Sequence, residues 1–262
     1  MTFEDKLDPG GRDRLRQGLN VVLAVTQMVT PYLARATGVG VPIQEQFSTP
    51  TWVTPAGYAF SIWGPIFIAS LAYAVYQARP GRRADPLLRR VGWLTAAAFA
   101  ACTAWAVAAQ LQAVWLTVPL IAVITGTLVA ALVRVAGWRE PLALPERWLV
   151  AAPLGVYAGW VTVATVANVA VALAFAGVRD LVLPGRAWGV VLMVAAGAIG
   201  AFVTLRTRRA GYALAVAWAL AAIAVARAQD APEVAAAAGG AAVLVLLVLL
   251  RSRSAARRPT AA

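Results

Sequence analysis

The chain has 262 residues, of which 61% are hydrophobic and only 13% are charged, and its formal net charge is +12. A typical soluble domain is about 45–50% apolar and about 25% charged, so this composition predicts a membrane protein and argues against a soluble enzyme. The basic residues stand in short clusters between long apolar runs. This indicates that they orient the chain in a membrane and do not form a surface that binds nucleic acid.

Three residue types that carry much of protein chemistry are nearly absent. The chain has no histidine, one cysteine (Cys102) and one lysine (Lys6). An intrachain disulfide and a zinc site of Cys and His ligands are therefore excluded, and a haem could be held axially only by weaker candidates such as Cys102, Met28, Met193 or a tyrosine. We expect no metal site and no obligatory cofactor.

The apolar runs predict eight transmembrane helices, because each can cross roughly 30 Å of hydrocarbon at about 1.5 Å per residue. The predicted fold is an all-α polytopic membrane bundle, with residues 1–17 and 252–262 as cytoplasmic tails. In chain order, the spans lie near 18–37, 55–78, 88–110, 112–136, 148–176, 185–206, 210–228 and 233–251.

The arginines predict an orientation with both termini in the cytoplasm. On this topology only four of the 23 basic residues fall on the outer side, as the positive-inside rule requires. The four outer residues are Arg35, Arg179, Arg186 and Arg227.

The composition also suggests a source and a location. Nearly all basic residues are arginine and alanine is abundant. This suggests a GC-rich bacterial genome and hence the bacterial cytoplasmic (inner) membrane.

A cleaved signal peptide is the main alternative for the first span. Val21–Val29 could be its short apolar region, and Ala34 and Ala36 flank Arg35 in a small-x-small cleavage pattern. The preceding segment is long and carries four acidic residues, which disfavours this alternative. They are Glu4, Asp5, Asp8 and Asp13.

Two longer motifs stand out, FSTPTWVTPAGYAFSIWGPIF at 47–67 and YAGWVTVATVAN at 157–168. They resemble, in turn, the first loop with the second helix and the fifth helix of the tryptophan-rich sensory protein family (TspO/MBR, translocator-protein-like). Gln112 and Trp115 stand where the family commonly has Asn-x-x-Trp. The resemblance covers residues 18–176, and residues 177–251 add three helices. Gly57 departs from the family's usual tryptophan, and Gln112 from its asparagine.

The resemblance implies a ligand pocket among the first five helices, roofed by the first loop. The family binds porphyrins and haem-like tetrapyrroles, and some members bind sterols. The candidate ligand-binding residues that this resemblance implies are Trp52, Tyr58, Phe60, Trp63, Phe67, Gln112, Trp115, Tyr157, Trp160, Ala164 and Asn168.

Helical spacing places Tyr157, Trp160, Ala164 and Asn168 on one face of the fifth span. There Asn168 and the tyrosine hydroxyl could hold the polar edge of a ligand while Trp160 stacks on its flat face. The alternative is that Asn168 only joins helices through a hydrogen bond, worth about 0.6 kcal/mol and up to about 2.

Two further patterns leave alternatives open. Trp52 could belong to an interfacial aromatic belt, whereas Trp63 and Phe67 lie too deep for one and form either a pocket wall or ordinary packing. Gly155 and Gly159 form a Gly-x-x-x-Gly pattern, which marks either an intrachain helix contact or a homodimer.

The function that we expect is a membrane receptor or carrier for a flat hydrophobic ligand, a tetrapyrrole or a sterol-like molecule. The alternative is a non-catalytic accessory or scaffold subunit of a membrane complex. An ion-coupled transporter and an enzyme are disfavoured, because all eleven acidic residues lie in tails or at span ends and no histidine is present. The last three spans carry few distinctive side chains, namely Trp188, Tyr212 and Trp218.

Overall fold

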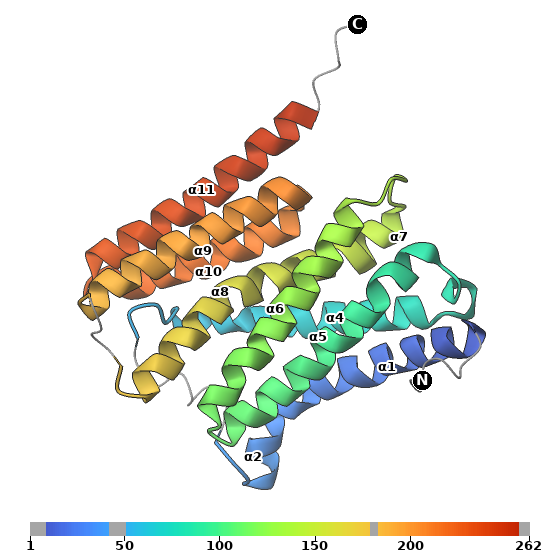
Figure 1. Cartoon of the computed structure of the whole chain (residues 1–262), viewed down its shortest axis with the longest axis horizontal. Helices are drawn as coiled ribbons and strands as arrows, with labels where there is room; N and C mark the ends of the chain where they lie inside the picture. The colour runs from blue at the N-terminus through green and yellow to red at the C-terminus, as the bar shows by residue number, and fades with distance from the viewer. Residues whose placement is uncertain (1–8, 42–50, 179–182, 257–262) are drawn as a thin grey trace, which may run out of the picture. The chain divides into compact units, whose positions relative to one another are not determined.

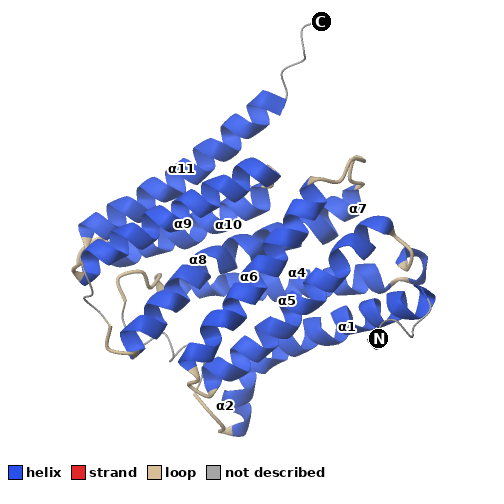
Figure 2. Ribbon diagram, in the orientation of Figure 1, coloured by secondary structure: helices blue, strands red, loops and turns tan. Residues whose placement is uncertain are grey.

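The computed structural model describes residues 9–41, 51–178 and 183–256, and the regular structure of these ranges is helical, without a strand (Figure 2). This confirms the predicted all-α polytopic bundle. In chain order the α-helices are α1 (Pro9–Val29), α2 (Leu33–Thr37), α4 (Trp63–Ala78), α5 (Pro86–Gln110), α6 (Val114–Ala136), α7 (Leu144–Glu146), α8 (Ala152–Phe175), α9 (Gly185–Thr207), α10 (Ala210–Arg227) and α11 (Pro232–Ala256).

Seven helical stretches in the described part of the chain are long and apolar enough to cross a membrane. The chain is therefore a multi-pass membrane protein, and these seven match the second to eighth predicted spans. They are Gly57–Ala78, Pro86–Gln110, Val114–Ala136, Leu144–Phe175, Gly185–Thr207, Ala210–Arg227 and Pro232–Ser254.

The first predicted span differs from the helix that forms. We expected it near 18–37, but α1 begins at Pro9 and ends at Val29, and a 3-10 turn then leads into α2. The first half of α1 carries several charged residues, so α1 is not among the described helices that are apolar enough to cross a membrane. Because α1 begins at Pro9, residues 9–17 are helical, although we expected them in a tail.

The chain divides into two compact units. Unit 1 comprises residues 1–46 and 63–153, and unit 2 comprises residues 47–62 and 154–262. In unit 1, α1 packs against α4 and α5, and α5 packs against α6. In unit 2, α11 lies alongside both α9 and α10 (Figure 1). The predicted domain boundary between residues 176 and 177 stays a prediction.

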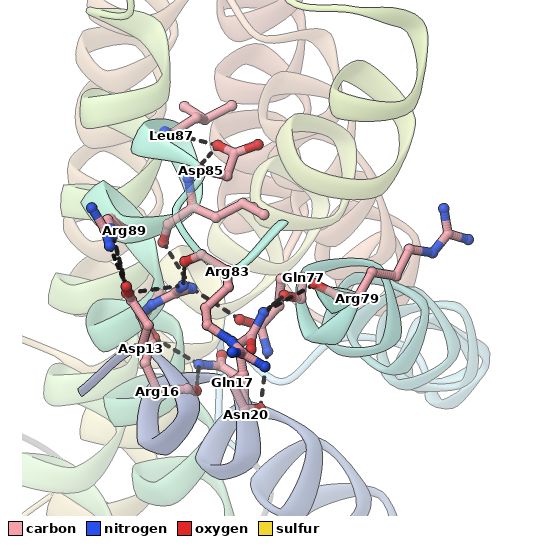
Figure 3. Close-up of polar contacts among 12 residues, drawn as sticks. Asp13, Arg16, Gln17, Asn20, Gln77, Arg79, Arg83, Asp85, Leu87 and Arg89 are labelled. Carbon is pink, nitrogen blue, oxygen red and sulfur yellow. Dashed lines mark hydrogen bonds and ion pairs between the residues drawn. The ribbon is translucent and has the colours of Figure 1, made fainter. Parts of the chain in front are cut away.

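Buried polar contacts hold α1 in unit 1 (Figure 3). The Arg16 side chain is only 1% exposed, and its Nη1 donates a hydrogen bond to Gln77 Oε1 of α4 at 3.0 Å. Its Nη2 donates to the carbonyl oxygen of Arg83 at 2.9 Å. Asn20 Nδ2 donates to the carbonyl oxygen of Gly92 in α5 at 2.8 Å. These contacts explain how a helix with so many polar residues packs among apolar helices.

Small residues set the approach of α8 and α10 in unit 2. A Cβ added at Gly159 would stand 2.4 Å from the carbonyl oxygen of Tyr212, and one at Gly155 would stand 3.0 Å from the Tyr212 nitrogen. The Tyr212 hydroxyl also donates to Thr162 Oγ1 of α8 at 3.2 Å. The Gly-x-x-x-Gly pattern therefore serves an intrachain contact, and the homodimer stays a prediction.

Candidate functional site

A pocket of about 850 Å³ lies within unit 2. Its wall comes from the segment before the 3-10 helix Gly57–Ile62, from the second half of α8, from the start of α9 and from the end of α10. It is lined by Thr51, Trp52, Val53, Val169, Ala170, Leu173, Ala174, Val178, Pro184, Gly185, Arg186, Trp188, Gly189, Leu192, Arg227 and Asp230.

The segment that carries Trp52 is fixed on unit 2 by backbone and packing contacts. The Ala56 nitrogen donates to the carbonyl oxygen of Ala222 in α10 at 3.1 Å. Gly189 of α9 makes room for Trp52 and Val234, because a Cβ added there would stand 3.0 Å from Trp52 Cβ and 2.9 Å from Val234 Cγ2. Trp52 is thereby held as one wall of the pocket.

The other walls follow from where helices begin and end. Gly177, at φ +76°, closes the turn after α8, and Pro184 stands as the N-cap residue of α9. Val169, Leu173 and Ala174 supply apolar surface from α8. The pocket is thus apolar along α8 and more polar near the start of α9 and the end of α10.

Two arginines mark the polar part of the wall. The Arg186 guanidinium carbon lies 5.0 Å from the centroid of the Trp52 ring, and Arg186 Nη1 lies 3.9 Å from Glu233 Oε1. Arg227 Nη1 donates to Asp230 Oδ2 at 2.9 Å. Arg227 Nε and Trp188 Nε1 are buried and have no hydrogen-bond partner among the described residues. The pocket wall therefore combines aromatic residues with two guanidinium groups.

Three of the predicted site residues make aromatic contacts within unit 2, namely Tyr58, Phe60 and Trp160. Tyr58 stands edge-on to Trp218, with ring centroids 5.6 Å apart, and Phe60 stands edge-on to Trp160 at 5.8 Å. Trp52 lines the pocket, whereas these two aromatic pairs do not. Two edge-on pairs thus adjoin the 3-10 helix Gly57–Ile62 that follows Trp52.

The predicted face of α8 is buried, except for Ala164, which is half-buried. Tyr157, Trp160 and Asn168 are each at most 2% exposed. Asn168 precedes Val169, the first α8 residue in the pocket wall, but is not itself part of that wall. The ligand-binding role of these side chains stays a prediction.

The remaining predicted residues belong to unit 1. The Trp63 ring stacks on Phe67, with centroids 5.2 Å apart, and on Trp105 at 6.4 Å. Gln112 has a φ of 59° in the turn between α5 and α6, and both Gln112 and Trp115 are exposed. Trp63 and Phe67 form an aromatic stack, and Gln112 and Trp115 line no part of the unit 2 pocket.

Sequence reasoning did not select Arg186, Trp188 and Arg227 as site residues. Two of them carried a signal, because Arg186 and Arg227 are exceptions to the predicted cytoplasmic bias of arginine. In the described ranges, no group of three or more His, Cys, Asp or Glu side chains could hold a metal ion. What the pocket offers is therefore apolar contact, aromatic stacking and hydrogen-bond donation.

The family comparison agrees with the resemblance found in the sequence. The model of the TSPO-like protein family matches residues 17–251. The chain belongs to the TSPO-like family. The match continues through α9, α10 and α11, so these helices lie within the family's pattern and not outside it. No curated protein and no solved structure matches the chain.

Proposed function

We propose that this TSPO-like protein binds a flat hydrophobic ligand, a tetrapyrrole such as a porphyrin or haem, for sensing or transport in the bacterial cytoplasmic membrane. The pocket in unit 2 is the proposed binding site. The observation that carries the proposal is a cavity of about 850 Å³ with two tryptophans in its wall. Ligand sites of small molecules are usually about 300–1,000 Å³ and mostly apolar.

The chemistry of the wall suits a planar ligand. Trp52 and Trp188 offer large aromatic surfaces, on which flat rings stack with offset or edge-on geometry. Leu173 and Leu192 offer apolar contact from α8 and α9. Membership of the TSPO-like family supports the same ligand class and a non-catalytic role.

The test is an equilibrium titration of the purified full-length protein in detergent with protoporphyrin IX. Binding is followed by the shift of the porphyrin absorption band and by tryptophan emission. We expect saturable binding, and we expect Trp52→Ala and Trp188→Ala to raise the dissociation constant about tenfold each, because each removes a stacking surface.

The matched control is Trp148→Ala. Trp148 is exposed, belongs to unit 1 and is not part of the pocket wall, so its replacement should leave the dissociation constant unchanged. A signal that rises linearly with porphyrin and never saturates contradicts the proposal. So does equal weakening by all three substitutions.

A further inference from the structure

The two arginines of the pocket are unusual for this chain. On the predicted topology, nearly all arginines stand on the cytoplasmic side, where they fix the orientation of the helices. Arg186 and Arg227 are two of the four exceptions. They come from the first turn of α9 and from the last residue of α10, yet both line the same pocket. Because both arginines line one pocket, we expect them to do something other than orient the helices in the membrane.

Arg227 has hydrogen-bonding capacity that its neighbours do not use. Its side chain is 17% exposed, and Nη1 is bonded to Asp230 at 2.9 Å. Its Nε has no hydrogen-bond partner among the described residues. A guanidinium offers five donors in a rigid fork that matches a carboxylate. Nε is enclosed, so a carboxylate in the pocket would accept from the Nη donors that Asp230 does not use.

Arg186 lines the same pocket and could bind the same carboxylate as Arg227. Its guanidinium carbon lies 5.0 Å from the centroid of the Trp52 ring, within the range of a cation–π contact, and such a contact does not use the N–H donors of the group. Its ion pair with Glu233 is long, at 3.9 Å, and both side chains are about half exposed. Exposed pairs of this kind contribute little free energy, so an anionic ligand could displace Glu233.

The start of α9 adds a favourable field. Pro184, Gly185 and Arg186 all line the pocket, and the N-terminus of α9 has no side-chain cap. The first backbone N–H groups of a helix and its dipole favour a negative charge. The arginines and the helix start thus gather in one part of a wall that is otherwise apolar.

We propose that Arg186 and Arg227 are the residues that bind the carboxylate of the ligand, while its flat apolar body lies against Trp52, Trp188 and the α8 wall. This inference rests on the proposed function, whose tetrapyrroles carry carboxylates, and adds to it the residues that recognise them. On the predicted topology, the ligand would present its carboxylate at the outer side of the membrane.

The test compares protoporphyrin IX, a dicarboxylic acid, with its neutral dimethyl ester in titrations of the full-length protein. We expect the wild type to bind the acid about tenfold or more tightly than the ester. In the double variant Arg186→Gln and Arg227→Gln, the dissociation constant of the acid should rise to that of the ester. The ester should bind both proteins equally.

The matched control is Arg206→Gln, which removes an exposed arginine from the last turn of the same helix, outside the pocket wall. It should preserve the preference for the acid. Equal binding of acid and ester by the wild type, or an unchanged preference in the double variant, overturns carboxylate binding by these two arginines and leaves the proposed function standing. Absence of saturable binding for both compounds overturns the proposed function itself.

Discussion

The guanidinium carbon of Arg186 lies 5.0 Å from the centroid of the Trp52 ring. This contact joins the first turn of α9 to the segment that precedes the 3-10 helix Gly57–Ile62. It brings a charged side chain and an aromatic face from distant parts of the sequence into one pocket wall. The account of function depends on this arrangement.

Filling the pocket should weaken ligand binding without changing its charged residues. Ala174 lines the pocket from α8, so Ala174→Phe would place a ring in the cavity. We expect at least about tenfold weaker binding of protoporphyrin IX, measured by the same titration. The control Ala198→Phe changes an exposed position of α9 outside the wall and should bind normally. Normal binding by Ala174→Phe would place the ligand elsewhere.

The close approach of α8 and α10 should depend on Gly159. A Cβ there would stand 2.4 Å from the Tyr212 carbonyl oxygen and 2.9 Å from Ala215 Cβ, so Gly159→Ala should destabilise the protein by about 1–3 kcal/mol. Thermal unfolding in detergent measures the change. Gly126→Ala in α6 is the control, since nothing lies within 4 Å of its added Cβ. If Gly159→Ala melted at the same temperature as the wild type, the close packing of α8 on α10 would be contradicted.

Stability should depend on the ionisation of Asp13 at low pH. Burial alone would raise the pKa of Asp13, but the hydrogen bond and charge of Arg89, aided by the charge of Arg16, lower it below the ordinary value of 3.8. Arg89 Nε donates to Asp13 Oδ2 at 3.0 Å. Because the folded pKa is the lower one, the stabilisation is complete above about pH 4 and is lost as the pH falls through the folded pKa.

The variant Asp13→Asn isolates this effect. The difference in melting temperature between wild type and Asp13→Asn should be largest at neutral pH and should shrink as the pH falls below about 4. Glu140→Gln, at an exposed position after α6, should show no such difference. A difference that stays constant from pH 7 to pH 3 would mean that the Asp13 charge is not what stabilises α1.

The proposed orientation can be tested with single cysteines. Asp230 is exposed at the end of α10, and Ser254 is exposed near the end of α11. In intact cells, a membrane-impermeant thiol reagent should label Asp230→Cys and should label Ser254→Cys only after the cells are opened. The native Cys102 is buried and should stay unlabelled. The reverse pattern would show that the arginine bias was misread.

Much of the fold follows from the length of apolar runs. Seven spans were predictable because a helix that crosses lipid must satisfy its own backbone groups and present apolar side chains. The start of α1 was not predictable in this way. Arg16 and Asn20 lower the hydropathy of the segment, yet they are buried through hydrogen bonds to α4 and α5. Such pairing is visible only in three dimensions.

The candidate site was predictable in part. Trp52 was selected through the family resemblance, and it lines the observed pocket. Trp188 was noticed only as one of the few distinctive residues of the last spans, and Arg227 only as an exception to the arginine bias. Neither hydropathy nor spacing shows that the start of α9 and the end of α10 adjoin Trp52. That proximity comes from the packing of unit 2.

Photo-crosslinking tests the central claim most directly. The full-length protein would be irradiated with a photoactivatable derivative of protoporphyrin IX, and the modified peptides identified by mass spectrometry. We predict labelling of the segment 51–53, the second half of α8 and the start of α9, suppressed by Ala174→Phe. Labelling confined to the aromatic stack of Trp63, Phe67 and Trp105 in unit 1 would contradict the account.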